Sequence, residues 1–328
     1  MTRIHPAEPD LSLVIPAYDE AESLPTLAAE IHDALRGSPW SYETLVVDDG
    51  SRDATPAVLA RLARQDPRIR AVRLERNSGQ SAALAVGFDR ARGAIVVTLD
   101  ADLQNDPADI PKLVWTLTSA DIDAVSGVRT ERHDTRLRRL SSRVANAVRR
   151  RVLRDGITDV GCSLKAYRRE ILVELPRFHG MHRFLPALIQ LYGGRVLEIP
   201  VRHRPRLHGC AKYGVHNRLW RGIADLMAVR WMQQRWIRPL ACRRAATTAP
   251  LGASRERLAG RFAPGRGDVA PEGLAHALGD KETPAWTSRP SGWSLDSSDR
   301  PSSAAASSSN GSLPSDADRA LSRSLSGT

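Results

Sequence analysis

The sequence predicts an α/β protein built on a mostly parallel sheet flanked by helices, and three observations support this fold class. Short segments rich in Val, Ile and Leu recur at 11–15, 44–47, 69–74, 95–99 and 123–128. Segments with apolar residues at helical spacing separate them, and acidic residues follow three of the apolar segments. Such alternation of strands and helices is typical of a parallel sheet covered by helices. At 328 residues the chain can bury a large core.

The elements are predicted in chain order from these patterns. The strand at 11–15 is followed by a helix whose apolar residues recur every three or four positions (Leu24, Leu27, Ala28, Ile31 and Leu35). The strand at 44–47 precedes a helix that starts near 53–56, and the strand at 69–74 precedes a helix over 82–91. The strand at 95–99 precedes a helix over 110–117, and a last strand is expected at 196–201.

Three of the predicted strands end in acidic residues. The first is followed by Asp19 and Glu20, the second by Asp48-Asp49, and the fourth by Asp100-Ala101-Asp102 with Gln104 close behind. Parallel strands bind ligands outside their carboxyl ends, and carboxylate and amide oxygens suit Mg²⁺ or Mn²⁺. Each acidic turn alone could simply cap a helix. Their expected convergence on one edge favours a nucleotide and metal site.

Two common nucleotide motifs are absent from the sequence. No GxGxxG follows the first strand, which argues against a dinucleotide oxidoreductase, and no GxxxxGK[ST] occurs, which excludes a P-loop. The formal charge of +11 and the pI near 10.3 indicate nucleic acid, an anionic membrane surface or phosphorylated substrates as partners. The three cysteines are scattered without metal-ligand spacing, which fits a reducing cytosol.

Four ordered motifs carry a resemblance to a known family: LSLVIPAYDEAESL, VVDDGSRDAT, RNSGQSAALAVGF and VTLDADLQNDPADIPKL. They resemble the family-2 glycosyltransferases with the GT-A fold, closest to the dolichol-phosphate mannosyltransferase and bacterial polyprenyl-phosphate glycosyltransferase branch. The resemblance covers about residues 10–235. It implies a single Rossmann-like GT-A domain over 11–235. It also implies inverting, metal-dependent transfer of a sugar from GDP-mannose or a UDP-hexose to dolichyl or undecaprenyl phosphate, with Mg²⁺ or Mn²⁺ as cofactor.

The resemblance assigns roles to residues at matching positions. The positions expected to hold the nucleotide sugar are Pro16, Tyr18, Glu20, Val47, Asp49, Asp100, Ala101, Arg129, Arg206 and Lys212. Within this set, Asp49 matches the acid that recognises the base. Asp102 and Gln104 match the metal ligands, and Asp159 matches an acid near the acceptor. Asp102, Asp159 and Arg206 are therefore the predicted catalytic residues. From the residues alone, Asp159 could equally cap a helix.

The segment RHRPRLHGCAKYG, residues 202–214, resembles the family's loop that closes over the diphosphate. Arg206 and Lys212 match its cations, and Ala211 stands where a serine is usual. Without the resemblance, such a segment is more often a solvated surface or a nonspecific phosphate patch. Its position after the last strand favours the closing loop.

The acceptor class is predicted from chemistry and from basic segments. A lipid monophosphate has a second pKa of about 6, so it is mostly a dianion at neutral pH and needs no base. A polysaccharide or protein hydroxyl is the alternative acceptor, but it would need a base beyond Asp159, and none stands out. Basic amphipathic helices at about 136–154 and 216–236 are expected at an anionic membrane surface. Two alternatives remain for these segments. Their apolar residues could pack on the sheet and leave a solvated arginine face, or their basic residues could form a nucleic-acid patch.

The two ends of the chain differ from the domain. Residues 1–10 form an amino-terminal extension without the apolar core of a signal peptide, and no run of about 18 apolar residues predicts a membrane-spanning helix. Residues 241–328 are rich in Ser, Pro, Gly, Ala and Arg, which predicts a disordered tail. We therefore expect a peripheral enzyme on the cytoplasmic face of the membrane. A noncatalytic membrane- or nucleic-acid-binding module is the alternative from another class.

Overall fold

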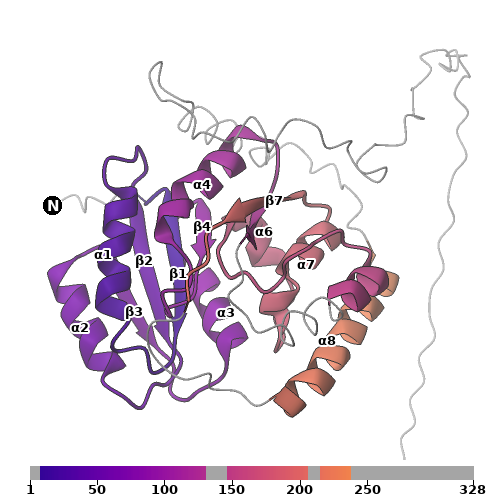
Figure 1. Cartoon of the computed structure of the whole chain (residues 1–328), viewed down its shortest axis with the longest axis horizontal. Helices are drawn as coiled ribbons and strands as arrows, with labels where there is room; N and C mark the ends of the chain where they lie inside the picture. Colours follow the sequence, from indigo (N-terminus) through magenta and orange to yellow (C-terminus); the bar gives the residue numbers. More distant parts are fainter. Residues whose placement is uncertain (1–7, 131–145, 206–214, 238–328) are drawn as a thin grey trace, which may run out of the picture. The chain divides into compact units, whose positions relative to one another are not determined.

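The computed structural model describes residues 8–130, 146–205 and 215–237. Within these residues the fold is built on a seven-stranded sheet (Figure 1). The strands are β1 (Leu11–Ala17), β2 (Tyr42–Asp48), β3 (Ile69–Arg73), β4 (Ile95–Thr98), β5 (Ala124–Arg129), β6 (Lys165–Arg168) and β7 (Val196–Val201). Their order across the sheet is β3-β2-β1-β4-β6-β5-β7. The mostly parallel α/β sheet predicted from the sequence is confirmed.

Helices cover both faces of the sheet (Figure 1). On one face, α1 (Leu24–Leu35), α2 (Thr55–Gln65) and α4 (Ile110–Ser119) pack on one core, and the short η1 (Pro107–Asp109) leads into α4. On the other face, α3 (Gln80–Arg90), α6 (Arg169–Glu174), α7 (Leu185–Leu191) and α8 (Val215–Arg235) share a second core with η2 (Met181–Arg183). Alternate residues of β1 enter the two cores, as Leu13 and Val14 illustrate, because successive strand side chains point to opposite faces.

The central strands place three acidic turns on one edge. β1 pairs in parallel with β2 on one side and with β4 on the other, so the three strands end side by side. The register aligns Ala17 with Asp48 and Val14 with Thr98. The predicted convergence of the turns after β1, β2 and β4 is therefore confirmed.

The antiparallel strand β6 was not predicted. It lies between β4 and β5 and pairs antiparallel with both. In a purely parallel sheet built in chain order, β5 would instead pair directly with β4. Its sequence, Lys-Ala-Tyr-Arg, lacks an apolar run, although Lys165 is 3% and Arg168 7% exposed. The Arg168 Nε donates to the carbonyl oxygen of Ile122 over 2.9 Å, so a backbone acceptor compensates this buried guanidinium. Hydrophobic patterning cannot find a strand whose buried side chains are charged.

The basic segment predicted at about 136–154 is only partly described. Residues 131–145 lie outside the described part, and residues 146–153 are helical. Within this helix Val148 is half exposed, as a surface role requires. Arg150, Arg151 and Arg154 are exposed, as predicted. Arg149 was predicted wrongly, because its side chain is buried, pairs with Asp155 and donates to the carbonyl oxygen of Ile157. Burial lowers the pKa of Arg149 and raises that of Asp155.

The second predicted basic helix, 216–236, corresponds to α8. Leu226 and Val229 are buried against the core, whereas Ile223, Met227 and Trp231 are 42%, 59% and 62% exposed. These three residues recur every four positions, so they form one apolar stripe on the helix surface. No helix in the described part of the chain is long and apolar enough to cross a membrane. Residues 1–7 and the predicted tail at 241–328 lie outside the described residues.

Candidate active site

The turns after β1 and β2 are joined by hydrogen bonds. The Asp19 amide donates to the Ser51 hydroxyl over 2.9 Å, and the Asp19 carboxylate accepts the Arg52 amide over 2.8 Å. The Glu20 amide donates to the Thr55 hydroxyl over 2.9 Å, while its carboxylate accepts the Ser23 hydroxyl. These contacts hold the two acidic turns as one unit, and Tyr18 lies half-buried beside them.

Asp49 fastens a third loop to this unit. Its two carboxylate oxygens accept the backbone amides of Ser78 and Gly79 over 2.7 and 2.8 Å. Burial raises the pKa of Asp49, and the two backbone hydrogen bonds oppose that rise. The carboxylate predicted to recognise the base therefore also fixes the start of α3 relative to β2.

The turn after β4 has a strained backbone. Leu103 lies between Asp102 and Gln104 with a φ of 62°, in the left-handed region that side-chain-bearing residues seldom adopt. The Asp102 carboxylate accepts the Gln104 amide over 3.2 Å. The Asp100 carboxylate accepts the side-chain amide of Gln80 over 2.8 Å. Such a backbone conformation persists only where the surrounding structure holds it in place. It is found most often at ligand and active sites.

The side chain of Asn105 helps to hold this strained turn in place. Its side-chain oxygen accepts the Ser163 hydroxyl over 2.6 Å and the Asp100 amide over 3.3 Å. An isolated bridge also pairs Asn105 with His203. The described beginning of the predicted diphosphate loop therefore contacts the acidic turn directly. Arg206 and Lys212 themselves lie outside the described residues.

The oxygen donors of this turn suit a hard divalent cation. Asp102 and Gln104, the predicted metal ligands, are neighbours in it, although Asp102 is only 7% exposed. No group of three or more His, Cys, Asp or Glu side chains within the described residues could hold a metal by itself. The donor set fits a cation whose remaining ligands are substrate oxygens and water.

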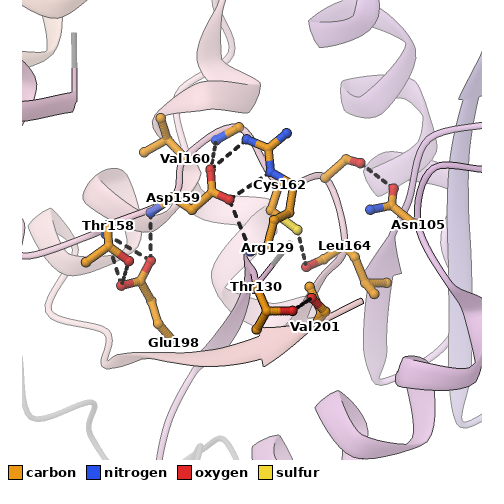
Figure 2. A network of polar contacts seen from close by, with 12 residues as sticks. Asn105, Arg129, Thr130, Thr158, Asp159, Val160, Cys162, Leu164, Glu198 and Val201 are labelled. Carbon is orange, nitrogen blue, oxygen red and sulfur yellow. Dashed lines mark hydrogen bonds and ion pairs between the residues drawn. The ribbon is translucent and has the colours of Figure 1, made fainter. Parts of the chain in front are cut away.

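Arg129 and Asp159 form a buried ion pair (Figure 2). The Arg129 Nε and Nη2 donate to the two carboxylate oxygens over 2.8 and 2.9 Å, and the Arg129 amide donates over 3.2 Å. The side chains of Arg129 and Asp159 are 18% and 2% exposed. Gly161 closes the pair from the other side, because a Cβ there would meet Nη2 at 2.7 Å. Asp159 therefore holds Arg129 in place, and its oxygens are occupied by donors.

A cavity of about 1330 Å³ opens beside the acidic turns. Pro16 and Asp100 line one end, and Ala224 and Asp225 of α8 line another part. Thr98, Lys165 and Tyr167 line it from the sheet, and residues of the α3 start and of 179–185 form further walls. The cavity therefore extends from the turn after β4 to the helix that carries the exposed apolar stripe.

The structure distributes the predicted site residues in three ways. Pro16 and Asp100 face the cavity, whereas Val47 and Ala101 are buried, so Val47 contributes its side chain to the core. Asp49, Asp102 and Gln104 lie on the acidic edge with Tyr18 and Glu20, and Arg129 and Asp159 pair beside it. The contacts that these residues make with a ligand stay predictions.

Sequence reasoning missed several polar residues of the cavity. Gln80 and Ser81 belong to the quoted motif RNSGQSAALAVGF, but no pattern showed that Gln80 would bond Asp100. Lys165 lies in the segment TDVGCSLKAYRR, in which only Asp159 received a predicted role, and His182 lies in a stretch without a motif. Tertiary contacts bring both side chains to the cavity.

The strands form a mostly parallel α/β sheet, and the cavity lies beside the carboxyl ends of β1 and β4. The model of glycosyl transferase family 2 matches residues 12–175. The chain belongs to this family.

Similar proteins of known name support the family assignment. The dodecaprenyl-phosphate galacturonate synthase of Rhizobium johnstonii is 40% identical over 235 residues, which cover 70% of this chain and 69% of that protein. The undecaprenyl-phosphate 4-deoxy-4-formamido-L-arabinose transferase of Sodalis glossinidius is 42% identical over 206 residues, 62% of this chain and 63% of that protein. The chain thus spans less than two thirds of the second relative.

Solved structures show the same fold at low identity. Glucosyl-3-phosphoglycerate synthase from Mycobacterium tuberculosis, crystallised with Mn²⁺, UDP-glucose and phosphoglyceric acid, has a TM-score of 0.52 and 21% identity. The alignment covers 69% of this chain and 80% of that one. The match confirms the GT-A architecture.

Proposed function

We propose that this protein transfers a sugar from a nucleotide sugar, GDP-mannose or a UDP-hexose, to a polyprenyl phosphate at a membrane surface. The observation that carries the proposal is the cavity, which joins the acidic turn after β4 to α8. The names of two relatives at 40% and 42% identity, a dodecaprenyl-phosphate and an undecaprenyl-phosphate sugar transferase, supply the acceptor class.

The two substrates occupy different parts of the site. The nucleotide belongs over β1 and β2, where Asp19, Glu20 and Asp49 are fixed by backbone and hydroxyl groups. Its diphosphate lies at the turn after β4, and the sugar projects past Asp100 into the cavity. The acceptor enters from the α8 side, so its phosphate meets the anomeric carbon inside the cavity.

The reaction needs no proton removal. A phosphate oxygen of the acceptor attacks the anomeric carbon while the bond from that carbon to the diphosphate breaks, which inverts the configuration. The acceptor is already mostly a dianion at neutral pH, because its second pKa is about 6. This agrees with Asp159 being committed to Arg129, since a buried, ion-paired carboxylate is poorly placed to act as a base. Arg129, which Asp159 holds in place, is the proposed partner of the diphosphate.

A divalent cation completes the donor site. Asp102 and Gln104 would hold Mg²⁺ or Mn²⁺, which would neutralise charge on the departing diphosphate. The Mycobacterium tuberculosis neighbour was crystallised with Mn²⁺ and UDP-glucose, which makes Mn²⁺ the first cation to try here.

The apolar stripe on α8 supports attachment to a membrane surface. Ile223, Met227 and Trp231 are exposed on one side of α8, while Ala224 and Asp225 of the same helix line the cavity. A helix with this pattern lies in the interface between head groups and acyl chains, and tryptophan favours that depth. Attachment through the stripe would bring the cavity next to the lipid phosphate.

A transfer assay with matched acceptors tests the proposal. Purified full-length protein is incubated with labelled nucleotide sugars, Mn²⁺ or Mg²⁺, and either undecaprenyl phosphate or undecaprenol in detergent micelles. We expect labelled lipid from the phosphate alone, and its loss in Asp102→Ala but not in the exposed control Asp33→Ala. Labelling of undecaprenol would refute the proposed phosphate acceptor. Transfer that Asp102→Ala leaves unaffected would refute the proposed metal site.

A further inference from the structure

A buried lysine on the floor of the cavity has no role in the function proposed above. Lys165 is 3% exposed and lines the cavity from β6. Its Nζ donates to the carbonyl oxygens of Cys162 and Val160. Two neutral acceptors compensate a buried ammonium poorly, because a charge away from water needs a counter-charge. An anion in the cavity would supply that charge.

The electrostatics around Lys165 agree with this. Burial lowers the pKa of Lys165, while the carboxylates of Asp159 and Asp100 oppose that effect. Asp159 also pairs with Arg129, and Asp100 also accepts from Gln80, so both carboxylates have partners besides the lysine. An arriving dianion would favour the charged ammonium and so strengthen its own binding.

A second nitrogen-bearing side chain, His182, also lines this cavity. The buried Ser81 hydroxyl accepts the Gly180 amide over 3.0 Å and contacts the His182 Nδ1 at 2.7 Å. If the hydroxyl donates to Nδ1, the ring proton of a neutral His182 is on Nε2. The contact with Ser81 holds the ring of His182, which lines the cavity.

We infer that Lys165 and His182 bind the phosphate of the acceptor between them, with Ser81 as the residue that positions His182. The inference rests on the proposed function and specifies the acceptor subsite within it. The subsite lies in the cavity that also contains Asp100 and is lined by Ala224 of α8. A phosphate held there is next to the expected sugar, and its lipid chain can leave toward α8.

Steady-state kinetics with undecaprenyl phosphate test the subsite. Lys165→Met should raise KM for this acceptor about 10- to 100-fold, the range expected for a lost hydrogen bond to a charged group, and leave KM for the nucleotide sugar within about twofold. The matched control is Lys112→Met, which removes another lysine bonded to a backbone carbonyl, that of Pro200 over 3.0 Å, and should change neither value. An unchanged acceptor KM in a folded Lys165→Met protein would overturn the inference.

Ser81 gives a second test that does not depend on the folding of the lysine variant. Ser81→Ala should raise the acceptor KM several-fold with little change in donor KM, and Ser81→Thr, which keeps the hydroxyl, should restore it. A purely structural role would instead lower kcat and stability in both variants. Equal acceptor KM in wild type and Ser81→Ala would remove His182 from the subsite.

Direct binding separates this inference from the proposed function. Geranyl phosphate, with geraniol as the control, is titrated into wild-type and Lys165→Met proteins by calorimetry. Binding of the phosphate alone, weakened in Lys165→Met, supports the subsite even if no sugar is transferred to undecaprenyl phosphate, in which case only the proposed function fails. No binding of geranyl phosphate to the wild type would overturn the inference itself.

Discussion

Replacing Asp159 with asparagine tests whether this acid is a structural partner or a catalytic base. The carboxylate accepts two guanidinium donors from Arg129 over 2.8 and 2.9 Å and the Gly161 amide over 3.1 Å. Removing one partner of a buried ion pair costs about 3–5 kcal/mol. Because the Arg129 side chain keeps 18% exposure, water partly compensates it, and we expect the lower end, about 3 kcal/mol. That corresponds to a fall in Tm of roughly 6–12 °C for a domain of this size.

The assay is urea and thermal unfolding of the wild type and Asp159→Asn, followed by transfer kinetics across pH. The control is Asp33→Asn, which breaks the exposed pair between Asp33 and Arg36 and should cost less than about 1 kcal/mol. The account predicts a destabilised variant with residual activity and an unchanged pH profile. A variant of wild-type stability that loses kcat together with the acidic limb of its pH profile would show that Asp159 acts as a base, and would refute the structural role.

Four further predictions follow from single contacts. Gly161→Ala should displace the guanidinium of Arg129, since the new Cβ would lie 2.7 Å from Nη2, and should raise KM for the nucleotide sugar about tenfold in initial-rate measurements. Burial lowers the pKa of Lys165, so the unfolded chain binds more protons between that lowered pKa and about 10.4. The free energy of unfolding should therefore rise with pH in that interval relative to Lys165→Met, as urea unfolding at two alkaline pH values would show; a parallel pH dependence of both proteins would contradict it. Asp225 is a carboxylate that lines the cavity, but a phosphate acceptor needs no general base, so Asp225→Asn should keep kcat within about threefold. A collapse of kcat with loss of the acidic limb of the pH profile would favour a hydroxyl acceptor. Trp231 is 62% exposed, and Trp231→Ser should weaken sedimentation with anionic vesicles several-fold while leaving transfer to a short-chain acceptor in solution intact.

The elements that could be predicted from the sequence are those with a clear pattern of apolar residues. The segments that became β1, β2 and β4 are continuous apolar runs followed by acids, so both the strands and the shared acidic edge could be predicted. β6 escaped because its buried residues include Lys165 and Arg168. Both side chains donate to backbone carbonyls, and no local sequence signal reports such contacts.

The site was predictable to a similar extent. Motifs led to Asp49 and Asp102. Asp102 accepts the amide of its near neighbour Gln104, whereas Asp49 accepts the Gly79 amide, 30 positions away. The motifs did not show that Asp159 would be enclosed by Arg129, or that Ser81 would meet His182 across 101 positions. Arg149 was expected on a basic surface, yet a buried aspartate six positions away draws it inward. Side-chain partners that no motif identifies decide these cases, whether they lie six positions away or 101.

The most direct measurement of the proposed reaction is phosphorus NMR of the complete mixture of enzyme, nucleotide sugar, cation and undecaprenyl phosphate. Attack by the acceptor phosphate on the anomeric carbon requires that nucleoside diphosphate and a lipid phosphodiester appear at equal rates as the lipid monoester signal declines. The account predicts this one-to-one course in the wild type and no change in Asp102→Ala. Nucleoside diphosphate that accumulates while the monoester signal stays constant would contradict transfer to a polyprenyl phosphate.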